Sequence, residues 1–289
     1  MTTLLIQKEN TTASNQVNQP KSKLPIWLNV DTFHKVRTRT TLLIIGWIVP
    51  FILFWLWQTA STSGWVNPQI LPAPSQVYQT LNDLWVSGDL WSNLKISLWR
   101  IFYGFLAGGI VGLLLGILIG VSRQAEAYIL PSFKAISLIP VIGWIPFFIL
   151  LVGIDDALKI LIIAKAAMVP LTINTYKGIR SIPAEYFELA RVYRLTRWQT
   201  VRRVLLPATI PSIFGGLRLS LTNAWISLVA VELLASSEGV GYLMVYGRQL
   251  FQLDLVIAMM VVIGLVGFFI DWILRHLENW LLKWRKPAF

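Results

Sequence analysis

Apolar segments of membrane-spanning length alternate with shorter polar segments over most of the chain. A helix needs about 20 mostly apolar residues to cross the hydrocarbon core of a bilayer. Six segments approach this length, and they cover residues 41–58, 96–121, 130–152, 158–176, 213–235 and 254–274. The pattern therefore predicts an all-α membrane protein with six transmembrane helices.

Prolines and charges interrupt two of these segments. The third contains Pro140 and Pro146, each of which removes a backbone donor and disfavours a straight helix. The fifth contains Arg218 and Glu232, and charges are costly in lipid. We therefore expect a broken third helix, and the third and fifth are the least regular of the six predicted helices.

Lysine and arginine are distributed unevenly between the connecting segments. If the N-terminus is cytoplasmic, the segments on that side hold 18 of the 25 basic residues. The opposite segments, 59–93, 153–157 and 236–253, hold only Arg248. Because basic residues are retained on the cytoplasmic side of a membrane, both termini are predicted to be cytoplasmic. Residues 1–40 are polar and basic, and we expect a disordered cytoplasmic tail there.

Composition narrows the possible functions. Hydrophobic residues make up 55% and charged residues 13% of the 289 residues, whereas soluble domains are about 25% charged. The net charge of +11 comes from basic residues between apolar segments, and this pattern fits the inner face of a membrane better than a nucleic-acid-binding surface. The chain has no cysteine and only two, widely separated histidines. We therefore expect no metal, no bound cofactor and no catalytic residue in this chain.

A ridge of glycines marks the second apolar segment. Glycine recurs every four residues, so the glycines share one helix face. They are Gly104, Gly108, Gly112, Gly116 and Gly120. The ridge predicts a close contact with another helix, within the bundle in preference to a seam between two copies.

Several charged residues fall within or near the apolar segments. Arg100, Lys159 and Asp271 are near enough to segment ends for their charges to reach the surface. Lys165, Arg218 and Glu232 lie deeper. One interpretation is an anion pathway formed by these three residues with Pro140 and Pro146. The other is an ion pair between Glu232 and a lysine or arginine, which would stabilise the bundle.

The longest predicted cytoplasmic segment, residues 177–212, is amphipathic rather than uniformly polar. Its pattern predicts two short helices beneath the membrane. Pro183 begins the first helix, and Pro207 and Pro211 are expected to end the second before the next span begins. A loop with this much predicted order indicates a docking element.

The same loop resembles the EAA loop of ABC importer permeases. Glu188-Leu189-Ala190 is followed after three residues by Arg194, and after nine more by Val204-Leu205-Leu206-Pro207. This spacing matches the family signature E-A-A, three residues, G, nine residues, I-x-L-P. Arg194 replaces the usual glycine, which serves where the chain turns with positive φ. The shape of that turn is therefore in question.

The resemblance extends over about residues 41–287 and so over nearly all of the expected permease domain, residues 41–289. Further segments look like permeases for aliphatic sulfonates, taurine and nitrate; they are Leu71–Ser75, 153–156, Leu206–Leu221, Ala235–Leu243 and Gln249–Val256. The resemblance implies a small anion as substrate, with an aliphatic sulfonate first and nitrate, bicarbonate, cyanate or taurine as alternatives. A self-sufficient secondary carrier or channel is the other class considered.

Partners and site residues also follow from the resemblance. It implies a cytoplasmic ABC ATPase dimer, a periplasmic or lipid-anchored substrate-binding protein and a second permease copy in a bacterial inner membrane. The chain lacks the phosphate loop G-x-x-x-x-G-K-[S/T], so ATP and Mg²⁺ would be bound by the partner. The residues implied in ATPase coupling are Glu188, Leu189, Ala190, Arg194, Leu206 and Pro207.

Overall fold

A computed structural model describes residues 30–67 and 69–283. These described residues are predominantly helical and contain no β-strand. The chain divides after Trp55 into two units, Met1–Trp55 and Leu56–Phe289. The described part of the first unit is the beginning of helix α1 (Val30–Thr62), which contains the predicted segment 41–58. Residues 30–40 of the predicted tail belong to α1, and the remainder of the tail lies outside the described residues.

The second unit holds the last turns of α1 and all later helices. The other predicted apolar segments also fall in helices, with 96–121 in α3, 158–176 in α6, 213–235 in α9 and 254–274 in α11. The elements are α2 (Pro74–Ser87), α3 (Asp89–Val121), α4 (Arg123–Ser137), η2 (Val141–Trp144), α5 (Ile145–Val152), α6 (Asp156–Arg180), α7 (Ala184–Val192), α8 (Arg197–Thr200), η3 (Val201–Leu205), α9 (Leu206–Ala235), α10 (Val240–Gln249) and α11 (Leu253–Leu281).

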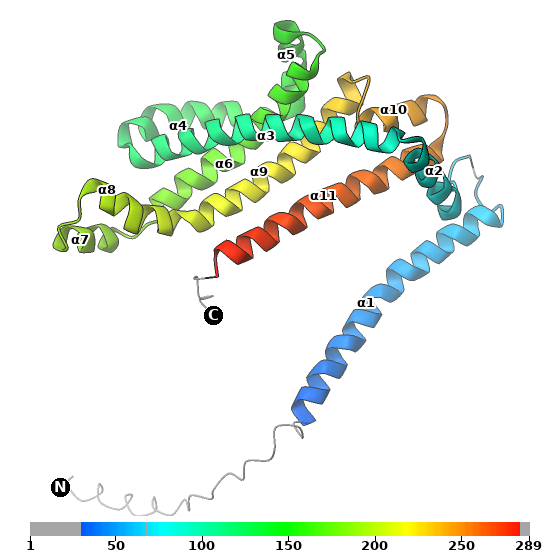
Figure 1. The fold of residues 1–289 in the computed structure, drawn as a ribbon, viewed down its shortest axis with the longest axis horizontal. Helices are drawn as coiled ribbons and strands as arrows, with labels where there is room; N and C mark the ends of the chain where they lie inside the picture. The colour runs from blue at the N-terminus through cyan, green and yellow to red at the C-terminus, as the bar shows by residue number, and fades with distance from the viewer. Residues whose placement is uncertain (1–29, 68, 284–289) are drawn as a thin grey trace, which may run out of the picture. The chain divides into compact units, whose positions relative to one another are not determined.

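Length and apolar character select three membrane-spanning helices among the described residues. They are Asp89–Val121, Arg197–Ala235 and Leu253–Leu281, and a bent pair of helices would make a fourth. Helix α6 is not among them. It contains Lys159 and Lys165 and lies between α3 and α9 (Figure 1). Its charges are therefore placed among protein groups as well as lipid.

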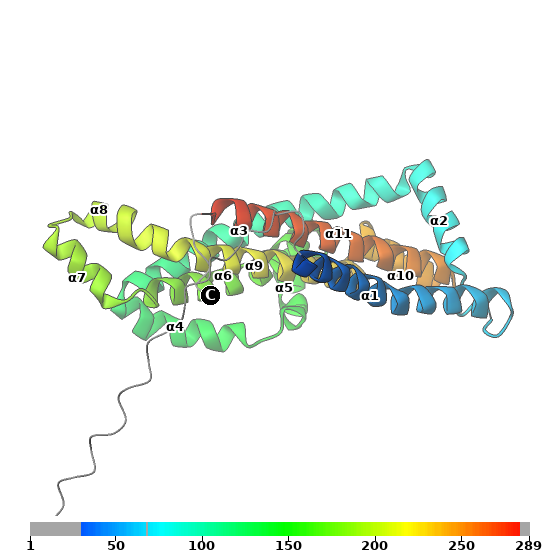
Figure 2. The same ribbon diagram turned by 90° about the horizontal axis from the view of Figure 1, so that it is seen from below.

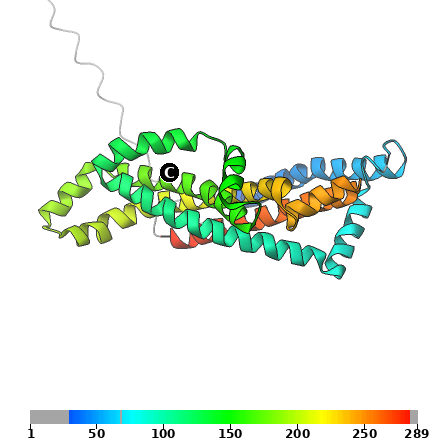
Figure 3. The ribbon, with the colours of Figure 1, turned by 90° about the horizontal axis from the view of Figure 1, so that it is seen from above.

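The glycine ridge packs α3 directly against α6 (Figures 1 and 3). A Cβ atom on Gly104 would lie 2.6 Å from Cβ of Ile163, and one on Gly112 would lie 2.7 Å from the carbonyl oxygen of Met168. The hydroxyl of Thr172 donates a hydrogen bond of 3.1 Å to the carbonyl oxygen of Gly112. The predicted contact within the bundle is therefore confirmed, because α6 occupies the space that the missing side chains leave.

The third predicted segment is broken, as its prolines indicated. Helix α4 ends at Ser137, and the chain bends by 94° before η2 and α5. Pro140 precedes η2, and Pro146 lies in the first turn of α5. A proline is tolerated in a first turn because the missing N–H would have no partner in the helix.

The expected stop before the fifth span is wrong. Helix α8, the π-helical turn η3 and α9 form one continuous run over Arg197–Ala235. Pro207 lies in the first turn of α9, just after η3, and Pro211 lies further inside α9. A proline ring clashes with the carbonyl four residues earlier, and for Pro207 that carbonyl belongs to Arg203 within the wider π turn. The local widening accommodates the ring without ending the helix.

Candidate functional site

Helices α7 and α8 form one end of the second unit, remote from α2 and α10 (Figure 2). Helix α7 begins after Pro183, as predicted. Glu188 is exposed, and Leu189 retains 55% of its accessible surface. The exposed apolar surface nearby also includes Val192 and Tyr193. An ordered helix that exposes apolar side chains beside a carboxylate is suited to contact another protein.

Ala190 does not share this exposure. Only 5% of its surface is accessible, so its small side chain is explained by packing within the chain. Contact of Ala190 with a partner stays a prediction, since within this chain the residue lies beneath the exposed surface of α7. The other residues of the predicted coupling set, Leu206 and Pro207, begin α9, so the loop leads directly into a predicted span.

Arg194 keeps the turn that a glycine would be expected to make. Its φ angle is 50°, in the left-handed region. The amide of Arg194 donates to the carbonyl of Arg191, and the amide of Leu195 donates to the carbonyl of Ala190, both at 2.9 Å. This pair of hydrogen bonds is the Schellman motif that ends many helices. The arginine therefore preserves the turn geometry of the family signature, at a cost of about 1–2 kcal/mol for a residue with a Cβ atom.

We expect Arg194→Gly to raise the stability of the protein by about 1 kcal/mol, because glycine adopts this φ without strain. Arg191→Gly is the matched control, since the same change inside α7 should lower stability by about 1 kcal/mol. Thermal unfolding of the purified protein in detergent measures both variants. Equal destabilisation by the two changes would contradict the strain at Arg194.

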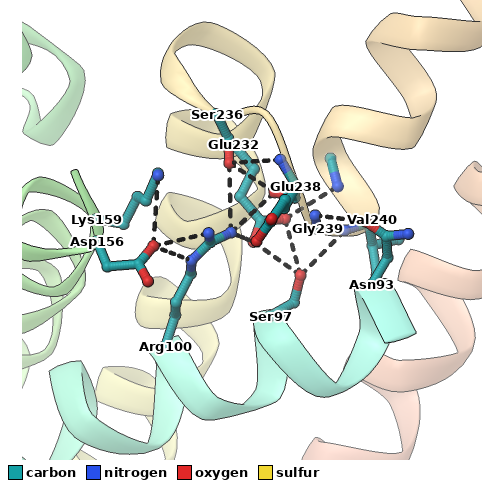
Figure 4. A network of polar contacts seen from close by, with 11 residues as sticks. Asn93, Ser97, Arg100, Asp156, Lys159, Glu232, Ser236, Glu238, Gly239 and Val240 are labelled. Atoms are coloured by element: carbon teal, nitrogen blue, oxygen red, sulfur yellow. Dashed lines mark hydrogen bonds and ion pairs between the residues drawn. The ribbon is translucent and has the colours of Figure 1, made fainter. Parts of the chain in front are cut away.

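A buried polar network lies at the opposite end of the bundle and joins α3, α6, α9 and the start of α10 (Figure 4). Its centre is the ion pair between Arg100 and Glu232, with 3.0 Å between Nη1 and Oε1. Arg100 is 4% and Glu232 1% exposed. The guanidinium also reaches Asp156, at 2.7 Å from Nη2 to Oδ1. Opposite charges thus hold three helices together.

The Glu232 carboxylate is covered by the turn that follows α9. It accepts hydrogen bonds from the Ser97 hydroxyl at 2.8 Å and from the Gly241 amide at 3.0 Å. Arg100 donates to the carbonyl oxygen of Glu238 at 2.9 Å. A Cβ atom on Gly239 would overlap the carboxylate, so the turn closes tightly over the charge.

Two expectations change with this network. Arg100 and Lys159 do not reach the surface, because both are 4% exposed. Glu232 does pair with a basic residue, and that residue is Arg100, which lies near the start of the second predicted apolar segment. The sequence contained a sign that Arg100 is buried, because Ser97 and Arg100 lie on the same helix face as the glycine ridge.

Arg218 also has an ion-pair partner. Its Nε lies 2.6 Å from Oδ1 of Asp271 on α11, and its Nη2 lies 3.1 Å from Oδ2. Arg275 adds a third charge to the pair, at 2.9 Å from Asp271. Arg218 and Glu232 therefore do not meet. Each belongs to a separate ion pair, with Asp271 and Arg100 respectively.

Lys165 and Pro140 do meet, at the bend between α4 and η2. They line a pocket of about 280 Å³ between this bend, α6 and α9. The Lys165 ammonium donates to the carbonyl oxygen of Ile139 at 2.9 Å and lies 4.9 Å from the centre of the Trp144 ring. Pro146 is not among the lining residues. Of the five residues predicted for an anion pathway, two thus share one cavity.

Known proteins similar to this chain are transport permeases. The family model described as "Binding-protein-dependent transport system inner membrane component" matches residues 108–283. A Bacillus subtilis protein named as an aliphatic sulfonates transport permease, SsuC, is 41% identical over 83% of this chain and 87% of its own length. The Escherichia coli protein of the same name is 36% identical over 85% of this chain and 93% of its own length.

Two further comparisons concern substrate and fold. The bicarbonate transport system permease protein CmpB of Synechococcus elongatus is 30% identical over 84% of this chain and 90% of its own length. The inward-facing MetNI methionine ABC transporter includes a chain of similar fold, with a TM-score of 0.50 and 22% identity over 66% of this chain and 97% of that one.

The family match agrees with the loop, the apolar helices and the fold. The permease subunits of this family are not themselves catalytic. The chain therefore belongs to the binding-protein-dependent transport system inner membrane components, the multi-pass permease subunits of ABC transporters.

Proposed function

We propose that this chain is the membrane subunit of an ATP-driven importer that moves an aliphatic sulfonate from the periplasm to the cytoplasm. The observation that carries the proposal is the exposed helix α7, whose Glu188-Leu189-Ala190 segment has the spacing of the EAA signature and is followed by a left-handed turn at Arg194. The relatives named for aliphatic sulfonates support the substrate.

The proposal includes three partners. A cytoplasmic ATPase dimer binds ATP and Mg²⁺ and receives α7, and its closure is transmitted through the continuous run α8–η3–α9 into the membrane. A periplasmic or lipid-anchored binding protein delivers the substrate, and a second permease copy completes the pathway. The basic residues around α7 support a cytoplasmic position for that end and for both termini.

Uptake measurements test the substrate. A strain with and without the gene is supplied with labelled alkanesulfonate, taurine, nitrate, cyanate or bicarbonate. Gene-dependent uptake of the alkanesulfonate alone supports the proposal. Gene-dependent uptake of bicarbonate instead would favour the second candidate, which the similarity to CmpB suggests. Uptake that survives ATP depletion and is abolished by a proton uncoupler would indicate a secondary carrier.

A charge reversal on α7 tests the coupling contact. We expect Glu188→Lys to reduce co-purification of the ATPase and ATP-dependent uptake by at least about tenfold, because one charged contact is worth about 1.5–3 kcal/mol. Asp83→Lys reverses an exposed carboxylate on α2 and is expected to leave ATPase binding unchanged. Normal assembly and uptake with Glu188→Lys would reject the contact.

A further inference from the structure

The pocket at the broken helix has walls of two kinds. A cation and small polar residues line it together with aliphatic residues. The polar residues are Ser137, Lys165, Asn223 and Ser227, and the aliphatic ones are Ile139, Val141, Val169 and Ile226. A solute that fits both kinds of wall has one charged end and one apolar end.

Lys165 is half-buried and lies in the middle part of α6. It is nine residues from the start of α6 at Asp156 and fifteen from its end at Arg180, which correspond to about 13 and 22 Å along the helix axis. Asn223 lies twelve residues before the end of α9 at Ala235, or about 18 Å. Both residues therefore lie several helical turns from these helix ends.

The ammonium of Lys165 has capacity to bind an anion. Among the described residues it has no carboxylate within ion-pair distance, in contrast to Arg100 and Arg218. One of its three N–H donors is used by the carbonyl oxygen of Ile139. Two donors remain, and the side chains of Asn223 and Ser227 make no hydrogen bond within the described part of the chain. A charge among apolar side chains is costly, and a bound anion would add an ion-pair partner to the contacts of Lys165 with the Ile139 carbonyl oxygen and the Trp144 ring.

The bend itself favours a cavity at this place. Non-helical backbone at membrane depth is tolerated where it is buried in protein or lines a polar cavity. Residues 138–140 separate α4 from η2, and Ile139 and Pro140 line the pocket. The volume of about 280 Å³ is slightly below the range for drug-sized ligands and suits a small organic anion.

We propose that this pocket is a binding site for an amphipathic organic anion, with Lys165, Asn223 and Ser227 holding the charged head and the aliphatic wall holding a short alkyl tail. This inference rests on the proposed function. It adds the place in the membrane subunit where the substrate is recognised. Nitrate and bicarbonate have a charged end but no tail, so they gain nothing from Val141, Val169 or Ile226. The site therefore selects a short alkanesulfonate over inorganic anions.

Equilibrium binding of labelled propanesulfonate tests the charged side of the site. The permease–ATPase complex is placed in lipid nanodiscs without a binding protein, so that only the membrane subunit can contribute selectivity. We expect saturable binding that Lys165→Gln weakens by at least about tenfold, because a charged hydrogen bond is lost. Lys165→Arg should retain binding. Lys134→Gln, which removes an exposed lysine of α4 outside the pocket, should not change it.

Competition experiments test the apolar side. Unlabelled propanesulfonate is expected to displace the label at lower concentration than nitrate or bicarbonate does. Val169→Thr keeps the side-chain shape and adds a hydroxyl, so it should weaken propanesulfonate binding several-fold and methanesulfonate binding less. Equal competition by nitrate, or equal effects on the two sulfonates, would overturn the assignment of the tail to this wall.

The outcomes separate this inference from the proposed function. If cells with the wild-type gene show no sulfonate uptake, the proposed function fails. If wild-type uptake is present and Lys165→Gln leaves both binding and uptake unchanged, the pocket assignment fails and the importer assignment stands. Absence of saturable propanesulfonate binding to the wild-type complex would likewise overturn the pocket assignment alone.

Discussion

Replacing Glu232 with alanine is expected to lower the stability of the permease by about 3–5 kcal/mol, the cost of breaking a buried ion pair on one side. The change leaves Arg100 with no buried partner, because the remaining carboxylate, Asp156, is 64% exposed. It also leaves the Gly241 amide and the Ser97 hydroxyl without their acceptor. Thermal unfolding of the protein purified in detergent measures the loss.

Glu238→Ala is the matched control for this prediction. Glu238 contributes its backbone carbonyl to Arg100, and its side chain is exposed. Removal of that side chain should therefore change stability by no more than about 0.5 kcal/mol. Glu232→Gln keeps a hydrogen-bond acceptor, so its stability should lie between those of Glu232→Ala and Glu238→Ala. Equal stabilities of Glu232→Ala and Glu238→Ala would contradict the role of the network.

Replacing Gly108 with alanine is expected to destabilise the contact between α3 and α6 by at least about 1–3 kcal/mol, the range for overpacked sites. A Cβ atom on Gly108 would overlap the backbone carbonyl of Ala164. Backbone cannot move aside as a flexible side chain can, so the two helices must separate. The yield of folded protein and its thermal unfolding temperature should both fall.

The adjacent glycine is the control. A Cβ atom on Gly109 would have the Cδ2 atom of Leu171 as its nearest neighbour, at 3.9 Å, an ordinary contact distance. Alanine there should raise stability by up to about 1 kcal/mol through its helix propensity. Both substitutions gain the same helix propensity. Opposite effects on stability would therefore be caused by the contact between α3 and α6. Similar effects of Gly108→Ala and Gly109→Ala would show that the ridge is not a close interface.

The ion pairs explain how a permease can hold charges in its helices and still be stable. Arg100 with Glu232, and Arg218 with Asp271, each satisfy a cation with a carboxylate from another helix. Such pairs give little net stability compared with apolar packing, but breaking them is expensive. They therefore fix which helix surfaces face one another. Lys165 is different because it faces a cavity and a carbonyl oxygen, and for that reason it is the candidate for contact with the transported anion.

Local sequence was sufficient for the features that depend on neighbouring residues. The apolar segments, the break at Pro140 and the start of α7 after Pro183 were all predicted, because hydrophobic length and proline act over one or two helical turns. The glycine ridge also predicted a close helix contact from its spacing. The stop expected at Pro207 failed, since a π turn absorbs a clash that single-residue rules treat as an end.

Contacts between distant residues depend on the tertiary structure. The apolar periodicity and the loop signature are local, and they were enough to predict an all-α membrane protein with a docking loop. They could not pair Arg100 with Glu232, 132 residues later, or show that Ala190 is buried and that Arg194 keeps a left-handed turn. Contacts between helices depend on how each is rotated and on what packs beside it. That information is carried by the whole bundle rather than by any one segment.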